Sequence, residues 1–506
     1  MTMKRNMIMV IVTVLMVGMA IPVVAQTSFE EYQRQKNAQF QTYKDQKQKD
    51  FDAYRREKNA RYAEFLRNKW GHFDATPIDT TMLEEPVVPP IVYQEPEPSP
   101  APQPQPEPTP SPILIDKDII VIPEPTPQPE PIVPIVPEPE PQHKIVSISF
   151  YGTNVSVSFP KKDEFAMPAL SDRAVADAWE CLMTDKYDIV ISTALEARKN
   201  LNLCDWAYIE LLQTVGEKQY GKNTNEAAFM QAYVLVQSGY KLRLAYSEGN
   251  RLYALIASQY EIYDRPYFEI DGEKFYPINC NEHSLYISEA SFDAEKPMSL
   301  QIAKEQLLSY EPSKNRTLTS RRGVTATVCV NKNNIAFYDN YPTACINDDF
   351  GTRWAAYANT PMEKTIRETL YPQLEKQIEG KDELGKVNAI LNWVQTAFVY
   401  KYDDEVWGGD RAFFAAESLY YPYCDCEDRS ILFSRIIRDI LHLDVVLLYY
   451  PGHLATAVHF NDDVNGDYLV VKGNKYIVCD PTYIGAPVGK TMTNMDNKTA
   501  KVIVLN

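Results

Sequence analysis

A cysteine, a histidine and an aspartate stand in this order near the C-terminal end of the chain, as Cys426, His453 and Asp480. Together these side chains supply a nucleophile, a base and a carboxylate that can orient the base. Their combined chemistry is attack of a thiolate on a carbonyl carbon, with a covalent acyl-enzyme as intermediate. We therefore expect Cys426 to attack, His453 to transfer the proton, and Asp480 to fix the tautomer of the imidazole.

A helix must position the cysteine. Apolar side chains in residues 427–441 recur at a spacing that predicts a helix with one buried face. Asp425 is the predicted N-cap and Asp428 completes a capping box, which places Cys426 in the first turn. A helix N-terminus favours the thiolate. Because Asp425, Glu427 and Asp428 oppose this effect with negative charge, we expect the thiol to need an imidazolium partner.

Strands must position the other two residues. Four β-rich segments follow the predicted helix, at residues 444–450, 455–460, 468–472 and 475–479. The pattern predicts a helix followed by an antiparallel meander. His453 would begin one strand and Asp480 would end another, so pairing of these two strands would bring the imidazole and the carboxylate together. His459 on the same predicted strand is a competing histidine.

Three segments resemble the transglutaminase-like superfamily: Tyr423–Ser430, Gly452–Ala455 and Val478–Thr482. The resemblance extends through the upstream segments 390–400 and 416–419 and covers roughly residues 360–488. It implies an α+β fold with a papain-like core, in which a nucleophile helix packs on an antiparallel sheet. It also implies a triad of Cys426, His453 and Asp480. Cys424 stands where the family has glycine, which removes backbone freedom and adds a second thiol.

The first 25 residues predict export. Two basic residues precede an apolar run that ends in Val23-Val24-Ala25, the pattern of a cleavable secretory signal at residues 1–25. We expect the mature protein to lie in the periplasm, the cell envelope or outside the cell, with no later transmembrane span. The formal net charge of −17 argues against nucleic acid as a partner.

A long helix is predicted at residues 26–73. Aromatic pairs recur every 11 residues: Phe29/Tyr32, Phe40/Tyr43, Phe51/Tyr54 and Tyr62/Phe65, with Phe73 continuing the register. A period of 11 residues places the pairs in one stripe and favours a right-handed coiled coil. The stripe predicts a homo-oligomer through residues 29–73, or packing against another part of the chain. A membrane surface is the alternative, which the scarcity of Leu, Ile and Trp disfavours.

A proline-rich segment follows at residues 74–142. Of the 36 prolines in the chain, 22 lie between Pro77 and Pro141. This composition predicts a polyproline II spacer that holds the globular part away from the helix. Two apolar islands, residues 113–115 and 119–122, break the pattern and are candidates for a short docking strand.

Residues 143–283 predict an α+β domain, and residues 225–279 repeat the outline of the helix and meander around Cys426. The alignment places Asn223, Asn250 and Asn279 at the triad positions, so such a copy would be inactive. The simpler interpretation is that any helix followed by a meander gives this match. Residues 284–359 are predicted to be a β-rich segment, and residues 360–506 a catalytic domain.

The leading hypothesis is an exported cysteine enzyme that acts on peptide or isopeptide amides through a thioester, as protease, deamidase or transglutaminase. The oxyanion donors would be the N–H of Cys426 and a side chain among Gln395, Tyr400 and Trp407. We expect no cofactor and no metal, because the sequence has neither a phosphate loop nor Cys/His pairs of zinc spacing. The alternative is a non-enzymatic scaffold or binding protein of the cell envelope.

The eight cysteines do not predict a disulfide scaffold in a chain of this size. Cys424 and Cys426 form the only close pair. They predict a redox switch, in which a disulfide between them would turn off the nucleophile.

Overall fold

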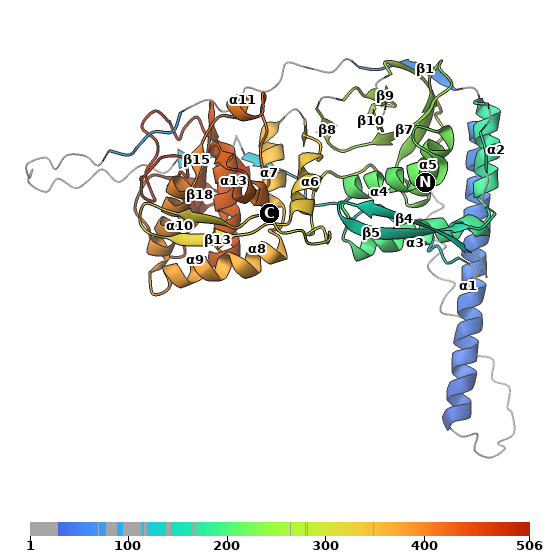
Figure 1. The fold of residues 1–506 in the computed structure, drawn as a ribbon, viewed down its shortest axis with the longest axis horizontal. Helices are drawn as coiled ribbons and strands as arrows, with labels where there is room; N and C mark the ends of the chain where they lie inside the picture. The colour runs from blue at the N-terminus through green and yellow to red at the C-terminus, as the bar shows by residue number, and fades with distance from the viewer. Residues whose placement is uncertain are drawn as a thin grey trace, which may run out of the picture. The chain divides into compact units, whose positions relative to one another are not determined.

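The computed structural model describes residues 29–68, 70–76, 89–94, 113–115, 119–137, 143–162, 165–167, 169–263, 265–278, 280, 282–347 and 349–506. The predicted signal segment, 1–25, lies outside these residues. The chain divides into two compact units, one ending at Arg55 and one formed by Arg56–Asn506. The fold class is α+β, with mixed and antiparallel sheets (Figure 1). No helix in the described ranges has the length and apolar character that crossing a bilayer requires.

The predicted long helix is present but ends earlier than expected. Helix α1 spans Phe29–Leu66. Strand β1 (Gly71–Asp74) follows it and pairs antiparallel with β11 (Ser284–Ile287), where Phe73 faces Leu285. The prediction of helix up to residue 73 is therefore wrong, because pairing with a sheet edge takes the place of the last turn.

The aromatic stripe of α1 divides into two parts. Phe40 and Tyr43 are 58% and 60% exposed, and Phe51 and Tyr54 are also exposed. Tyr62 is only 2% exposed, and its ring centroid lies 4.5 Å from that of Trp179. Packing against the chain itself thus accounts for the C-terminal end of the stripe. Self-association through the exposed part stays a prediction.

The first half of the larger unit has a six-stranded sheet with helices packed on it. The strand order is β1-β11-β6-β7-β10-β9, and all pairs are antiparallel. The further bounds are β4 (His143–Phe150), β5 (Thr153–Pro160), α2 (Asp172–Leu182), η1 (Asp185–Tyr187), α3 (Asp188–Asn200), α4 (Asp205–Tyr220), α5 (Asn225–Gln237), β6 (Leu242–Tyr246), β7 (Leu252–Ala257), β8 (Glu261–Ile262), β9 (Phe268–Ile270) and β10 (Glu273–Pro277).

The sequence predicts a β-rich segment at residues 284–359. In the structure this segment does not form a sheet of its own. Strand β11 belongs to the six-stranded sheet. Only the hairpin of β12 (Arg316–Thr319) and β13 (Thr325–Val328) and the short β14 (Ala344–Cys345) add strands. Helices α6 (Lys332–Asp339) and α7 (Phe350–Asn359) make up much of the rest. The side chain of Asn331 caps α6 by accepting from the N–H of Asn333, which selects helix over strand here.

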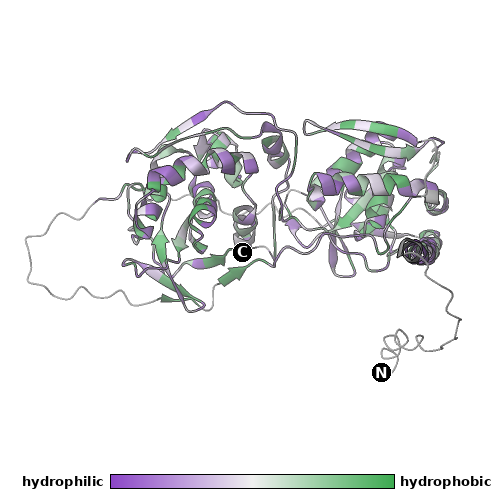
Figure 2. Cartoon of the chain, turned by 90° about the horizontal axis from the view of Figure 1, so that it is seen from below, coloured by the Kyte–Doolittle hydropathy of each residue, from purple (hydrophilic) through white to green (hydrophobic). Residues whose placement is uncertain are grey.

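The last third of the chain has helices on one face of a seven-stranded sheet. The order is β2-β19-β20-β18-β17-β21-β3, and Figure 2 shows the hydrophobic colour along much of these strands. The remaining bounds are α8 (Lys364–Thr369), α9 (Tyr371–Ile378), α10 (Glu383–Ala397), β15 (Val399–Tyr400), α11 (Asp403–Val406), α12 (Ala415–Tyr420), β16 (Tyr423–Cys424), α13 (Cys426–Ile436), η2 (Ile437–Leu441), β17 (Val445–Tyr450), β18 (His453–Val458), β19 (Tyr468–Val471), β20 (Asn474–Cys479), β21 (Lys501–Val504), β2 (Ile113–Leu114) and β3 (Ile119–Val121).

The apolar islands of the proline-rich segment form both edge strands of this sheet. Strand β2 pairs parallel with β19, and β3 pairs parallel with β21. The chain from Leu114 to Ile119 reaches at most about 17 Å, whereas seven flat strands measure about 29 Å across. The sheet must therefore curl, and Ile115 is buried in the apolar core of its concave face, with Val446 and Leu448.

Other parts of the proline-rich segment are also packed on the folded chain. The guanidinium of Arg198 donates to the carbonyl of Pro129, and Gln128 donates to the carbonyl of Leu203. Gly239 has φ +93° and lies against the carbonyl of Glu130, where a Cβ would come within 2.3 Å. The prediction of a free spacer is thus wrong for these residues, because buried donors and sheet edges bind the segment.

The two larger sheets share one strand order. The series β11-β6-β7-β10-β9 matches β21-β17-β18-β20-β19, with the same antiparallel pairing at each step. In each sheet the helix that precedes the strands, α5 or α13, packs on the middle strand, β7 or β18. The repeat foreseen for residues 225–279 is therefore present in topology and extends over five strands.

The register corrects which residues correspond to the triad. The N-cap residues Thr224 and Asp425 both accept from the third helical N–H, so Asn225, not Asn223, matches Cys426. The N–H of Ser247 donates to the carbonyl of Arg251. In the first sheet, this pair occupies the position that Tyr450 and His453 occupy in the seven-stranded sheet. Arg251, not Asn250, therefore matches His453, because the turn of the first copy is one residue longer. Asn279 lies outside the described residues.

We predict that Ile115→Ala destabilises the seven-stranded part of the protein. Removing buried methyl groups from the concave core should cost about 2–4 kcal/mol of unfolding free energy. Denaturant unfolding of the mature protein measures this change. Ile145→Ala is the matched control, because Ile145 is 66% exposed. Equal stability of both variants would contradict the role of Ile115.

Candidate functional site

Cys426 is the first residue of α13, as the sequence predicts. The side chain of Asp425 accepts from the N–H of Asp428, and the side chain of Asp428 accepts from the N–H of Asp425, which completes the capping box. The helix packs on β18, and Ile431 and Leu432 on the helix are buried. The helix therefore fixes the thiol above the start of the strand that carries His453.

His453 and Asp480 are joined by a buried hydrogen bond. His453 begins β18 and Asp480 follows β20, and these strands pair antiparallel. Nε2 of His453 lies 2.9 Å from Oδ2 of Asp480. The other oxygen, Oδ1, accepts from the N–H groups of Thr482 and Tyr483 at 2.8 and 3.1 Å. Both carboxylate oxygens are thus held, and the imidazole has one fixed edge.

Nδ1 of His453 is the atom left for the proton of the thiol. It is buried and has no hydrogen-bond partner among the described residues. The next residue, Leu454, directs its N–H to the sulfur of Cys426. His459 is not a competitor, because its Nδ1 bonds to the carbonyl of Lys475 at 2.9 Å. The structure thus joins His453 to Asp480 and places the sulfur of Cys426 against Leu454, the residue that follows His453.

The thiol of Cys426 is held in its protonated form. Its Sγ lies 3.2 Å from Oε2 of Glu427, to which it donates. Burial, then the negative charges of Glu427 and Asp425, raise the pKa of Cys426 well above its usual value, and the N–H of Leu454 lowers it only in part. Neither Cys426 nor His453 has any exposed surface. In this conformation the site is closed and the sulfur is held as a thiol.

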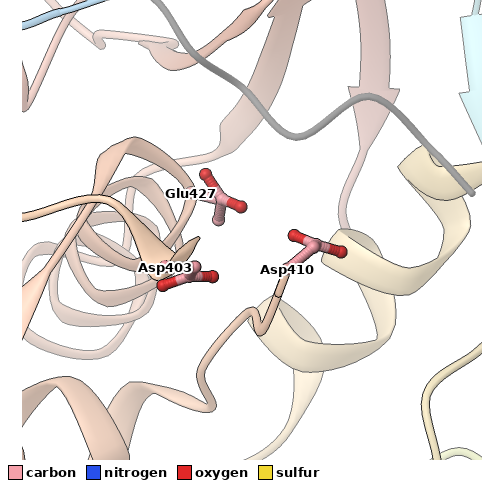
Figure 3. A group of neighbouring side chains, drawn as sticks. All are labelled: Asp403, Asp410 and Glu427. Carbon is pink, nitrogen blue, oxygen red and sulfur yellow. The ribbon is translucent and has the colours of Figure 1, made fainter. Parts of the chain in front are cut away.

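Three carboxylates converge beside the thiol. Ligand oxygens of Asp403, Asp410 and Glu427 lie within 4.8 Å of one another, and Figure 3 shows the side chains directed into a common space. Burial, then the charge of Asp410, raises the pKa of Glu427 to about 7. The guanidinium of Arg353 lies 2.6 Å from Oδ2 of Asp410 and supplies the positive charge of the cluster.

This cluster is the group that could offer three oxygen ligands to a hard cation. Arg353 already occupies one side of Asp410, and the N–H of Arg411 donates to Asp403 at 2.6 Å. An acidic cluster does not by itself assign a metal. The expectation that the reaction uses no metal and no cofactor stays a prediction.

The structure distinguishes between the three predicted oxyanion donors. Gln395 is fully engaged: its Nε2 donates to the carbonyls of Asp480 and Ala486, and its Oε1 accepts from Gly485. Its function is to hold the loop after β20. Trp407 lies away, against Arg411, Phe413 and Tyr421.

Tyr400 is the candidate that remains. Its hydroxyl is buried without a hydrogen-bond partner. After burial, the groups that raise its pKa most are Cys426, Asp425 and Glu427, so its hydroxyl lies within electrostatic range of the thiol. The guanidinium of Arg429 lies 5.3 Å from the ring centroid and positions it.

Cys424 stands in an ordinary extended backbone. It belongs to β16, which pairs parallel with β15, and it is not among the residues with positive φ. The site therefore does not need the freedom of a glycine here. Both thiols are free. Sγ of Cys424 faces the carbonyl of Val399, whereas that of Cys426 faces Glu427. A disulfide between them would require the junction of β16 and α13 to rearrange, so the redox switch stays a prediction.

Sequence reasoning missed the buried charges that surround the triad. Arg353 on α7 lies outside the recognised motifs, and Asp403 and Asp410 lie between the segments 390–400 and 416–419 but belong to neither. Only the unusual density of acidic residues around Cys426 gave a signal that compensating groups must exist.

The chain was compared with protein-family models, curated proteins and solved structures, and none of them matches it. The geometry of the site is thus the basis for any functional proposal.

We predict that Glu427→Gln makes Cys426 more reactive. Removing a negative charge next to the sulfur lowers the pKa of the thiol, so alkylation by iodoacetamide at pH 8 should be about tenfold faster or more. The carboxyl of Glu427 is charged only above its pKa of about 7. The difference between variant and wild type should therefore shrink as the pH falls to 5.5.

The rate is measured by mass spectrometry of the peptide that contains Cys426. Glu375→Gln is the control, because Glu375 is an exposed carboxylate on α9, outside the site. An unchanged or slower rate in Glu427→Gln would contradict the proposed electrostatic restraint on the thiol.

Proposed function

We propose that the protein is an exported cysteine enzyme of the transglutaminase-like superfamily, with a papain-like core, acting on peptide or isopeptide amides. One observation carries the proposal. A buried imidazole bonds through Nε2 to a carboxylate, and its Nδ1 is unbonded next to a strand N–H that contacts a cysteine at a helix N-terminus. This arrangement suits a nucleophilic triad.

In the reaction, the proton of Cys426 passes to Nδ1 of His453 as the sulfur attacks the carboxamide carbon. The tetrahedral oxyanion is bound by the N–H of Cys426 and the hydroxyl of Tyr400. Collapse breaks the C–N bond, and the leaving amine or ammonia takes the proton from His453. The thioester is then attacked by water, which gives hydrolysis, or by a primary amine, which gives a new amide. Asp480 stabilises the imidazolium throughout.

The closed site requires an opening step before substrate binds. The covering segment consists of Tyr400, Tyr402 and the helix α11 that follows. Tyr402 lies close enough to Cys426 for the thiolate to raise its pKa. Movement of this segment would expose the sulfur and carry Asp403 away from Glu427.

A second candidate is a non-enzymatic envelope binding protein that uses the same fold. The complete burial and the raised pKa of Cys426 are the observations that favour it. The intact hydrogen bond between His453 and Asp480 favours the enzyme, because a binding protein has no need for a buried base with a free nitrogen.

We expect the mature protein to release ammonia from glutamine-containing envelope proteins or peptidoglycan peptides, or to incorporate a labelled primary amine into them. Cys426→Ala should lower either activity by at least about 10³-fold, because the thioester cannot form. The half-buried Cys329→Ala is the matched control and should retain the activity.

Amine incorporation would identify an acyltransferase, and ammonia or peptide release alone would identify a hydrolase. Activity that survives in Cys426→Ala would contradict the enzyme proposal. Absence of any reaction across these substrates would support the binding-protein candidate instead.

A further inference from the structure

The six-stranded sheet and its helix α5 form the first copy of the fold. The position in this copy that corresponds to the triad also carries polar side chains. Asn225 is the first residue of α5, as Cys426 is of α13. Oδ1 of Asn225 accepts from the N–H of Leu252 at 2.9 Å, in the same way that the sulfur of Cys426 faces the N–H of Leu454. Arg251, before Leu252, takes the place of His453. The equivalence thus extends from topology to individual hydrogen bonds.

A hollow opens at this position, between α4, α5 and β7. Its volume is about 40 Å³, enough for one small polar group. It is lined by polar side chains of α4 and of the turns before α5 and β7, among them Gln213, Glu217, Asn223 and Arg251. The catalytic copy differs, because its thiol and imidazole are completely covered. The first copy has lost the nucleophile and the base but has an accessible site.

Arg251 is a cation available to a ligand. It is half-buried, and within the described ranges it forms no ion pair. Its one hydrogen bond to a side chain runs from Nη2 to Oδ1 of Asn223, at 2.7 Å. The ring of Tyr253 lies below its guanidinium, with 5.6 Å between the guanidinium carbon and the ring centroid. The remaining N–H groups of a planar guanidinium can therefore bind an oxygen acceptor in the hollow.

Glu217 determines which acceptor fits. It lines the same hollow and would repel a carboxylate. A primary carboxamide offers a carbonyl oxygen to Arg251 and an NH₂ group to Glu217, and it needs no net charge. We propose that the first copy is a recognition site for the carboxamide side chain of glutamine or asparagine in a peptide. The inference deepens the proposed function, on which it rests for the substrate class, by adding a second, non-catalytic site for the same group.

The test uses the mature full chain with Cys426→Ala, so that binding is measured without turnover. The probe is the N-methylamide of N-acetyl-photoleucyl-glutaminyl-glycine, in which the glutamine side chain is the one primary carboxamide, and the comparison probe carries glutamate in place of glutamine. After irradiation, mass spectrometry locates the cross-links. We expect the glutamine probe to label peptides within residues 213–231 or 251–254.

Adding Arg251→Met should lower this labelling about tenfold, the loss expected for one charge-assisted hydrogen bond. Arg322→Met, in an exposed turn, is the matched control and should leave the labelling unchanged. Labelling that is absent from these segments, that is insensitive to Arg251→Met, or that is equal with the glutamate probe would overturn the proposal. Because no turnover is involved, failure of the catalytic proposal does not change this readout.

Discussion

The hydrogen bond between Nε2 of His453 and Oδ2 of Asp480 is the interaction on which the rest of the site depends. It exists because β18 and β20 are neighbours and because the loop after β20 is held by Gln395. Its strength depends on the exclusion of water, which the helices on one face of the sheet and Ile115 on the other provide. The edge strands from the proline-rich segment are therefore part of the sheet that holds this hydrogen bond.

The charges around Cys426 oppose the formation of its thiolate. A helix N-terminus and the N–H of Leu454 favour the thiolate, while burial, Glu427 and Asp425 favour the thiol. In the closed conformation burial and the carboxylates prevail. A buried sulfur that is held as a thiol is a poor nucleophile, and it is also protected from oxidants.

Much of the catalytic part could be predicted because its signals are local. The spacing of apolar residues gave the helix after Asp425, and alternation with turns gave the strands from β17 to β20. The neighbouring positions of His453 and Asp480 followed from the meander alone. The features that the sequence did not predict depend on contacts between residues that are far apart in the chain. The apolar islands at β2 and β3 were candidates for a docking strand, but a proline-rich composition does not indicate which sheet lacks edge strands or that both edges are filled from one segment.

The other errors have the same origin. The last predicted turn of α1 is instead a strand that pairs with β11. One extra residue in the turn before β7 means that Arg251, and not Asn250, corresponds to His453. The compensating Arg353 lies on a helix that carries no motif. Propensity and spacing fix elements, whereas edges, registers and charge partners are decided by segments far apart in the chain.

The tautomer of His453 tests the account most directly. Selective ¹⁵N labelling of histidine, with assignment by the loss of signals in His453→Gln, reports which ring nitrogen carries the proton. We predict that Nε2 is protonated and bonded to Asp480 while Nδ1 is unprotonated at neutral pH, ready to accept the proton of Cys426. A neutral imidazole with the proton on Nδ1 would contradict the triad, because that nitrogen could not act as the base.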